Sequence, residues 1–293
     1  MAALFRTRLT ELFGIEHPIL MGGLMWLADA RYVAAAVNAG GMGFISARTF
    51  MEPERFRAEL RACREATGGR PFGVNLYLSQ RPAENAFVPG HIDIMLEEGV
   101  RLIETSGVPP KEFLPRLKDA GCVVMHKVAA VRHAVSAEKL GVDAISIVGA
   151  EGGGHQGLHM IGTIVQALRA AQALAVPVAV GGGIGHGAQL VAALALGADA
   201  VVMGTRMLVA EEIWAHREVK ERVVAAQETD TRLIMASFRN TSRVLDNEDA
   251  RRIEELERQG VADFEAYSHY VKGTRQLEAY ETGDWNKGTL SMG

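Results

Sequence analysis

One histidine stands within a run of glycines, and it is the residue of this sequence best placed to do chemistry. His155 lies in residues 149–157, whose sequence is GAEGGGHQG. Glycine has no side chain that could act on a substrate, whereas a neutral imidazole can accept a proton or hydrogen-bond a substrate oxygen. We therefore predict that His155 is catalytic; the alternative is the structural or surface role expected for most of the nine histidines.

The same run matches the GxGxxG pattern at residues 152–157, which in other proteins opens a dinucleotide-binding helix. An acidic residue normally follows that pattern about 20 positions later, and none stands there in this sequence. We therefore interpret Gly153 and Gly154 as a flat backbone surface that lies against a planar ring, with His155 beside it.

Two more glycine clusters follow apolar runs that are typical of buried strands. Gly181, Gly182 and Gly183 end one such run, and Gly204 and Thr205 end the next. Backbone N–H groups of glycine loops can approach phosphate oxygens closely, and a threonine hydroxyl adds a further donor. The two clusters predict a phosphate site, with tight turns as the alternative explanation.

Polar side chains also interrupt apolar segments. Asn75 and Tyr77 lie two residues apart in PFGVNLYL, so they face the same side of a predicted strand, and Lys127 lies near the end of CVVMHKV. A buried amide needs a partner, so Asn75 is expected to fix a loop or to contact a ligand. Lys127 either places its ammonium group in the binding site or is a solvated loop residue. Residues 21–26, MGGLMW, could line a ligand, because the glycines allow close approach of the backbone and the methionines supply polarizable apolar groups. The alternative is that they pack in the core.

These residues need a scaffold that brings many strand ends together. Short β-rich runs alternate with helical stretches of about a dozen residues, several ending in a glycine such as Gly40, Gly141 or Gly197. Eight runs are predicted as strands: residues 17–23, 42–47, 71–78, 101–107, 122–128, 144–150, 176–182 and 200–205.

Eight successive units predict an α/β fold, a (β/α)8 TIM barrel over residues 1–210. In such barrels the active site forms from the loops after the strands, and a phosphate site commonly follows strands seven and eight. Residues 211–293 are charged and helical. They predict a helical cap segment on the substrate side, one helix of which returns to cover the eighth strand.

The composition argues against several classes of partner. Lys and Arg total 31 and Asp and Glu total 35, which gives a net charge of −4 without a long run of either sign. Nucleic acid and anionic membranes are therefore not expected to bind. Cys63 and Cys122 lie outside the spacings of metal sites, so we expect both to be structural and expect no metal. No secretory signal or membrane-spanning stretch is evident, which predicts a cytoplasmic protein.

Several motifs together resemble the FMN-dependent nitronate monooxygenase (2-nitropropane dioxygenase) family over nearly the whole predicted barrel. They are HPILMGGLMWLADARYVAAAVNAGGMGF, RPFGVNLYL, HKVAAVRHAVSAEKLGVDAISI, EGGGHQG and GGGIGHGAQLVAALALGADAVVMGTRML. The third of these, with LIMASFRNTSRVLDN, is most similar to the NADH:quinone reductase branch of the family.

The resemblance implies an FMN-dependent oxidoreductase of the NAD(P)H:quinone reductase type. NAD(P)H would be its reductant, and its partner would be a small-molecule electron acceptor or a nitronate. A nitronate monooxygenase that uses O2 and an enoyl-thioester reductase are alternatives. A phosphate-ligand binding protein is the alternative outside enzymes. The oligomeric state stays open, with a homodimer as one candidate.

The resemblance also implies a role for each residue, with His155 matching the catalytic histidine of the family. The expected flavin-ring contacts are Gly23, Leu24, Met25, Asn75, Tyr77, Lys127, Gly153 and Gly154, and the expected phosphate contacts are Gly181, Gly182, Gly183, Gly204 and Thr205. This sequence differs from its relatives at His186, where they carry an acidic residue, and at Tyr77, which is bulkier than usual. It also ends at GDWNKGTLSMG, where relatives continue into a last helix.

Overall fold

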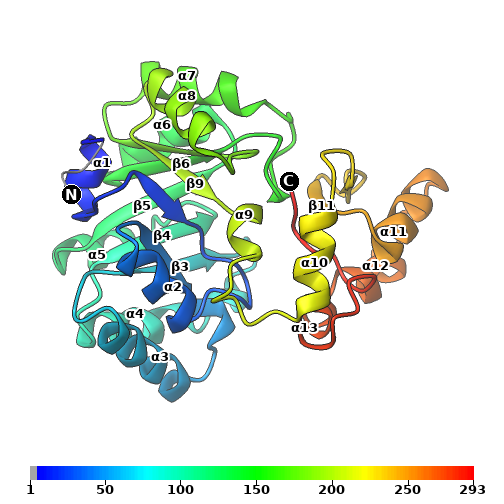
Figure 1. Cartoon of the computed structure of the whole chain (residues 1–293), viewed down its shortest axis with the longest axis horizontal. Helices are drawn as coiled ribbons and strands as arrows, with labels where there is room; N and C mark the ends of the chain where they lie inside the picture. The colour runs from blue at the N-terminus through cyan, green and yellow to red at the C-terminus, as the bar shows by residue number, and fades with distance from the viewer. Residues whose placement is uncertain (1–4) are drawn as a thin grey trace.

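The computed structural model describes residues 5–293, and its larger part is a closed barrel of eight parallel strands (Figure 1). The barrel strands are β1 (Ile19–Met21), β2 (Met42–Ser46), β3 (Gly73–Leu78), β4 (Leu102–Gly107), β5 (Val123–Val128), β6 (Ala144–Val148), β8 (Val178–Gly181) and β9 (Ala200–Met203). Each lies within a segment predicted as a strand. The predicted (β/α)8 TIM barrel is therefore confirmed.

Helices surround the barrel and cover the outward apolar side chains of its strands. They are α2 (Ala30–Asn38), α3 (Pro53–Ala66), α4 (Val88–Glu97), α5 (Leu114–Asp119), α6 (Val131–Leu140), α7 (Thr163–Ala173) and α8 (Gly187–Ala195), with short 3₁₀ turns η1 (Ala47–Thr49) and η2 (Pro82–Asn85). Gly141 ends α6 with a φ of +98°, and Gly40 and Gly197 lie just after α2 and α8 with φ of +86° and +94°. These left-handed helix ends agree with the prediction.

The barrel interior changes from apolar at its base to polar at its mouth. Leu9 and Phe13 of α1 (Arg8–Phe13) pack against inward-facing residues such as Phe44 and Met125, which closes the base. Side chains alternate along a strand, so residues two positions nearer the carboxyl ends of the strands also face inward. On β3 to β6 those residues are Asn75, Glu104, Lys127 and Ser146.

The C-terminal part forms a separate layer beside the barrel mouth, which we call the cap (Figure 1). After the short helix α9 (Thr205–Leu208), the cap contains α10 (Arg217–Ala225), β10 (Thr231–Ile234), β11 (Ser242–Leu245), α11 (Glu248–Arg258), α12 (Glu265–Val271) and α13 (Gly273–Thr282). Its antiparallel sheet has the order β10-β11-β7, where β7 (Gly154–His155) comes from the barrel segment.

The cap differs from the helical segment that the sequence predicts because it also contains strands. Each of the two, β10 and β11, has only four residues, too few to give a clear alternating pattern. Helix α8 packs on the last barrel strand, β9, and the later helices lie in the cap (Figure 1). Buried residues of α10 and α13 belong to the same apolar core as the barrel helices, and the cover of the eighth strand by a tail helix stays a prediction.

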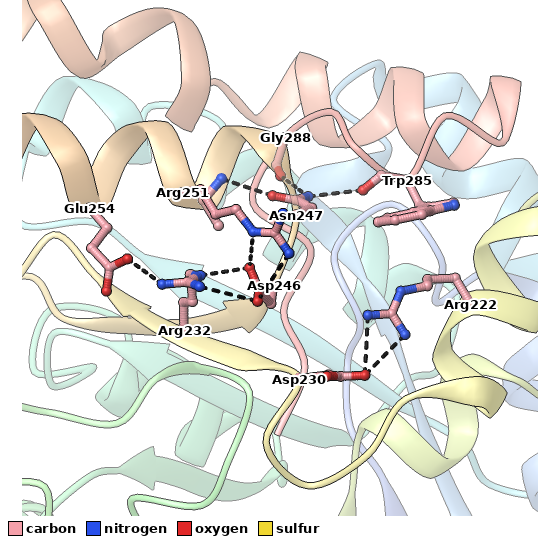
Figure 2. Close-up of polar contacts among 10 residues, drawn as sticks. Arg222, Asp230, Arg232, Asp246, Asn247, Arg251, Glu254, Trp285 and Gly288 are labelled. Carbon is pink, nitrogen blue, oxygen red and sulfur yellow. Dashed lines mark hydrogen bonds and ion pairs between the residues drawn. The ribbon is translucent and has the colours of Figure 1, made fainter.

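Ion pairs and amide contacts hold the cap elements together (Figure 2). Arg232 on β10 and Arg251 on α11 both contact Asp246, at 2.6 and 2.8 Å. Burial opposes the charge of this carboxylate, but the two guanidinium groups hold the pKa of Asp246 at about 2. Asn247 caps α11, and its amide donates to the carbonyl groups of Trp285 and Gly288, each at 2.9 Å. The C-terminal segment is thus fixed to α11.

Within residues 5–293, no helix is both long and apolar enough to span a membrane. The same part of the chain holds no group of three or more side chains suited to a metal ion. Cys63 and Cys122 are buried free thiols, and burial raises the pKa of Cys63 to about 12. Burial also raises the pKa of Cys122. Both thiols are therefore protonated at neutral pH and are poor nucleophiles.

Candidate active site

The glycine loops after β6 and β8 lie directly against each other at the barrel mouth. A Cβ on Gly182 would stand 3.0 Å from the carbonyl oxygen of Gly149, and Gly182 has a φ of +107°. Thr163, at the start of α7, joins the loops, because its hydroxyl lies 2.7 Å from Glu151 Oε2 and 2.9 Å from the Gly182 carbonyl. Gly183 follows with a φ of +66°. Glycine is required at these positions by both space and backbone conformation.

Gly181 and Gly204 complete this region at the ends of β8 and β9. A Cβ on Gly181 would stand 3.2 Å from Val202 Cβ, so the backbones of the two strands approach closely there. Gly204 precedes α9, whose first residue is Thr205. The structure therefore brings the five predicted phosphate-contacting residues to the same end of the barrel.

The last residues of the chain lie across the glycine run. The Gly293 N–H donates to Thr205 Oγ1 at 3.1 Å, and a Cβ on Gly153 would stand 2.7 Å from the backbone nitrogen of Met292. In Figure 1 the C-terminus accordingly lies between the barrel and the cap. Gly153 is thus in contact with the C-terminal segment, a long-range contact that no local sequence pattern predicts.

His155 lies where the barrel and the cap meet. It belongs to β7 and pairs with Ser242 of the cap strand β11, and Gly154 before it has a φ of +81°. Its side chain is accessible to solvent, but the surrounding protein desolvates the ring and lowers the pKa of His155 below its ordinary value. The imidazole is therefore neutral at pH 7 and able to accept a proton.

Asn75 and Lys127 meet at a residue that the sequence analysis missed, Glu104. The Asn75 amide donates to Glu104 Oε2 at 2.5 Å, and the Lys127 ammonium lies 3.2 Å from the same oxygen. Glu104 is completely buried, whereas the Lys127 side chain is 26% exposed. The pattern that singled out Asn75, a polar residue within an apolar strand, also occurs at Glu104 in RLIETSG and could have identified it.

The loop after β1 lies over Asn75. A Cβ on Gly23 would stand 2.6 Å from Asn75 Cβ, so only glycine allows this approach. Leu24 and Met25 follow and are partly buried, and Ser46 Oγ lies 3.9 Å from the Met25 sulfur. These residues supply apolar surface beside the Asn75 amide.

Tyr77 lies nearer the rim than Asn75. It is 42% exposed, and the guanidinium group of Arg48 lies 5.4 Å from the centre of its ring. Arg48 also pairs with Glu84 of η2 at 3.3 Å. The structure thus joins Tyr77 to a charged group at the rim and not to the hydrogen bonds around Glu104.

The barrel places its glycine loops, a neutral histidine and a lysine paired with a buried carboxylate at the carboxyl ends of its strands, where TIM-barrel enzymes have their active sites. The family model described as "Nitronate monooxygenase" matches residues 6–293. The chain therefore belongs to the nitronate monooxygenase family, whose members are flavin-dependent oxidoreductases.

Known proteins agree with this assignment. The chain is 37% identical over 222 residues to the (3aS,4S,5R,7aS)-5-hydroxy-7a-methyl-1-oxo-octahydro-1H-indene-4-carboxyl-CoA dehydrogenase of Mycobacterium tuberculosis, a match that covers 75% of this chain and 61% of that protein. It thus spans less than two thirds of the length of this relative.

Two solved structures share the whole architecture. FabK from Thermotoga maritima is 34% identical with a TM-score of 0.89, over 99% of this chain and 89% of that one. Nitroalkane oxidase from Streptomyces ansochromogenes is 27% identical with a TM-score of 0.81, over 97% and 91%. The barrel and the cap are therefore common to all three proteins.

Proposed function

We propose that this chain is an oxidoreductase that holds FMN at the barrel mouth. The observation that carries the proposal is the close contact between the glycine loops after β6 and β8, at the mouth of a barrel that also holds the polar cluster of Asn75, Glu104 and Lys127. Glycine loops at strand ends suit a phosphate, and buried polar groups beneath them suit the polar edge of a ring.

Within this proposal each part of the mouth has a distinct task. Backbone N–H groups of Gly181, Gly182 and Gly183 bind the phosphate, and Lys127 hydrogen-bonds the ring. The flavin supplies hydride or electron transfer when bound, and the protein supplies binding, orientation and electrostatics. His155, neutral at pH 7, accepts a proton from the substrate or hydrogen-bonds its oxygen.

Two observations favour different substrates. The motifs of residues 126–147 resemble the quinone reductase branch, with NAD(P)H as reductant. The relatives from Mycobacterium tuberculosis and Rhodococcus jostii, 37% and 36% identical, are both named as carboxyl-CoA dehydrogenases. We propose a CoA thioester as the first substrate class to test, because two relatives name that class. Quinone reduction is the second.

One anaerobic experiment separates these functions. Purified protein is mixed with FMN, its visible spectrum is recorded, and either an acyl-CoA or NADH is then added. Bleaching by the acyl-CoA supports thioester oxidation, whereas bleaching by NADH followed by reoxidation with benzoquinone supports quinone reduction. Oxygen consumption with an alkyl nitronate, without a response to NADH, would support nitronate oxidation. A protein that does not bind FMN would refute the proposed function altogether.

A further inference from the structure

The buried carboxylate of Glu104 is the feature of the barrel mouth that the proposed function leaves unexplained. We propose that Glu104 is a positioning residue that holds Lys127 and Asn75 beneath the flavin ring and sets the reduction potential of the flavin by offsetting the charge of Lys127. This inference rests on the proposed function, since it assumes that FMN binds at the mouth.

The strand register brings these three side chains together. Asn75 and Glu104 are paired residues on β3 and β4, and Glu104 is paired with Met125 on β5. Lys127 lies two residues beyond Met125, so its side chain enters the barrel on the same face, one step nearer the mouth. Glu104 therefore lies below the ammonium group and beside the amide, and contacts both through Oε2.

The hydrogen bonding of Glu104 is incomplete. Within the described part of the chain, Oε1 of Glu104 is buried without a partner, and so is the hydroxyl of Ser146 on β6, which is paired with Lys127. A buried carboxylate with an unpaired oxygen costs stability, and an ion pair that served only the fold would be expected to satisfy both oxygens. Strained or costly polar groups of this kind are typical of functional sites.

The solvent exposures of Glu104 and Lys127 indicate which of the two side chains lies nearer to a ligand at the mouth. Glu104 is fully buried, while the Lys127 side chain is 26% exposed, so the cation lies on the mouth side and the carboxylate beneath it. A flavin that has gained two electrons carries more negative charge on its pyrimidine ring at neutral pH. With a flavin bound at the mouth, Lys127 would stabilise that charge and Glu104 would oppose it. Loss of the Glu104 charge should therefore favour the reduced flavin.

The test compares Glu104→Gln with the wild-type chain. Gln keeps the size of Glu and can still hydrogen-bond Asn75, but it leaves Lys127 without its counter-charge. In Glu104→Gln, we expect the dissociation constant of oxidised FMN divided by that of reduced FMN to rise about tenfold relative to wild type. That ratio corresponds to an upward shift of about 30 mV in the two-electron midpoint potential, measured with an equilibrating redox dye.

Glu98→Gln is the matched control. Glu98 is also a buried carboxylate bound to cations, namely Arg57, Arg61 and Arg64, but it lies at the end of α4 outside the barrel. Its substitution should leave the potential unchanged. The same potential in Glu104→Gln as in wild type, with FMN bound to both, would overturn the inference and leave the proposed function intact.

A second variant keeps the test decisive if Glu104→Gln does not fold. Lys127→Met removes the cation and leaves the carboxylate, so the dissociation-constant ratio should fall about tenfold. An unchanged potential in Lys127→Met would also overturn the inference. If the wild-type chain and Glu98→Gln both fail to bind FMN, the proposed function and this inference fail together.

Discussion

At the scale of single residues, the histidines illustrate how position decides chemistry. His155 is accessible at the junction of barrel and cap, and desolvation lowers its pKa. His126 is buried on the outer side of β5, where its Nδ1 lies 2.9 Å from the Thr105 hydroxyl. Both rings are neutral at pH 7, but only His155 is accessible to a substrate. His155 is therefore the proposed catalytic residue, and His126 is a structural one.

His155→Ala should lower kcat/KM by about 10²- to 10⁴-fold, the usual contribution of a positioned acid or base. FMN binding should persist, because none of the glycine backbone is altered. Steady-state kinetics and the visible spectrum of the same preparation measure both properties. His159→Ala, in the same loop, is the control and should keep full activity. Equal kcat/KM in His155→Ala and wild type would contradict the catalytic role.

His126 makes the fold sensitive to acid. Desolvation lowers its pKa to about 4 in the folded chain, against 6.5 for the free side chain. Between these two values only the unfolded chain binds the proton, so stability falls as the pH drops from about 6.5 to 4 and the loss levels off below that. The unfolding free energy should fall by about 3 kcal/mol over this range.

Urea unfolding at a series of pH values measures this effect. His126→Gln keeps a hydrogen-bonding group near Thr105 but cannot be protonated in this range, so its stability should depend less steeply on pH. The same steepness in His126→Gln and wild type would show that other groups cause the acid sensitivity.

At the scale of elements, the loops after β6 and β8 depend on glycine because their backbones touch. Gly182→Ala would place a Cβ 2.6 Å from Thr163 Oγ1 in a left-handed backbone conformation. We expect a loss of about 2–4 kcal/mol in unfolding free energy and weaker FMN binding, because the strain falls on the loop that binds the phosphate.

Gly185→Ala provides the comparison within the same loop. Its Cβ would stand at an ordinary 3.6 Å from Arg206 Cβ, and Gly185 is not in the left-handed region. Thermal melts and FMN titrations of both variants should therefore show a large change only for Gly182→Ala. Equal behaviour of the two variants would argue against a tight contact between the loops.

In the molecule as a whole, we expect the barrel, residues 5–210, and the cap, residues 211–293, to unfold as one unit. The cap sheet includes β7 of the barrel segment, and Arg243 of β11 donates to the carbonyl of Ala150 at 3.0 Å. Cap residues such as Tyr280 and Leu290 also belong to the same apolar core as the outer face of the barrel. Contacts of this kind couple the two parts.

Calorimetry should therefore show a single transition for the wild-type chain, with equal calorimetric and van't Hoff enthalpies. Arg243→Met removes the hydrogen bond to the loop after β6 and should broaden or split that transition. Two separate transitions in the wild-type chain would contradict the coupling of cap and barrel.

The local features of this protein can be predicted from patterns of neighbouring residues. The alternation of apolar runs and helical stretches located all eight barrel strands, and spacing identified the glycine loops, because strand burial and helix ends depend on neighbouring residues. A polar residue in an apolar strand singled out Asn75 in the same way. The same rule applied to RLIETSG would have found Glu104 as well.

Which of these residues touch depends on how the whole chain folds. The pairing of His155 with Ser242, the two bonds to Glu104 Oε2, and the contact of Met292 with Gly153 join residues 23 to 139 positions apart. Such contacts follow from barrel closure and from the way the cap folds back, and no local pattern encodes them. The sequence thus specified the parts of the site, and the closed barrel determined their geometry.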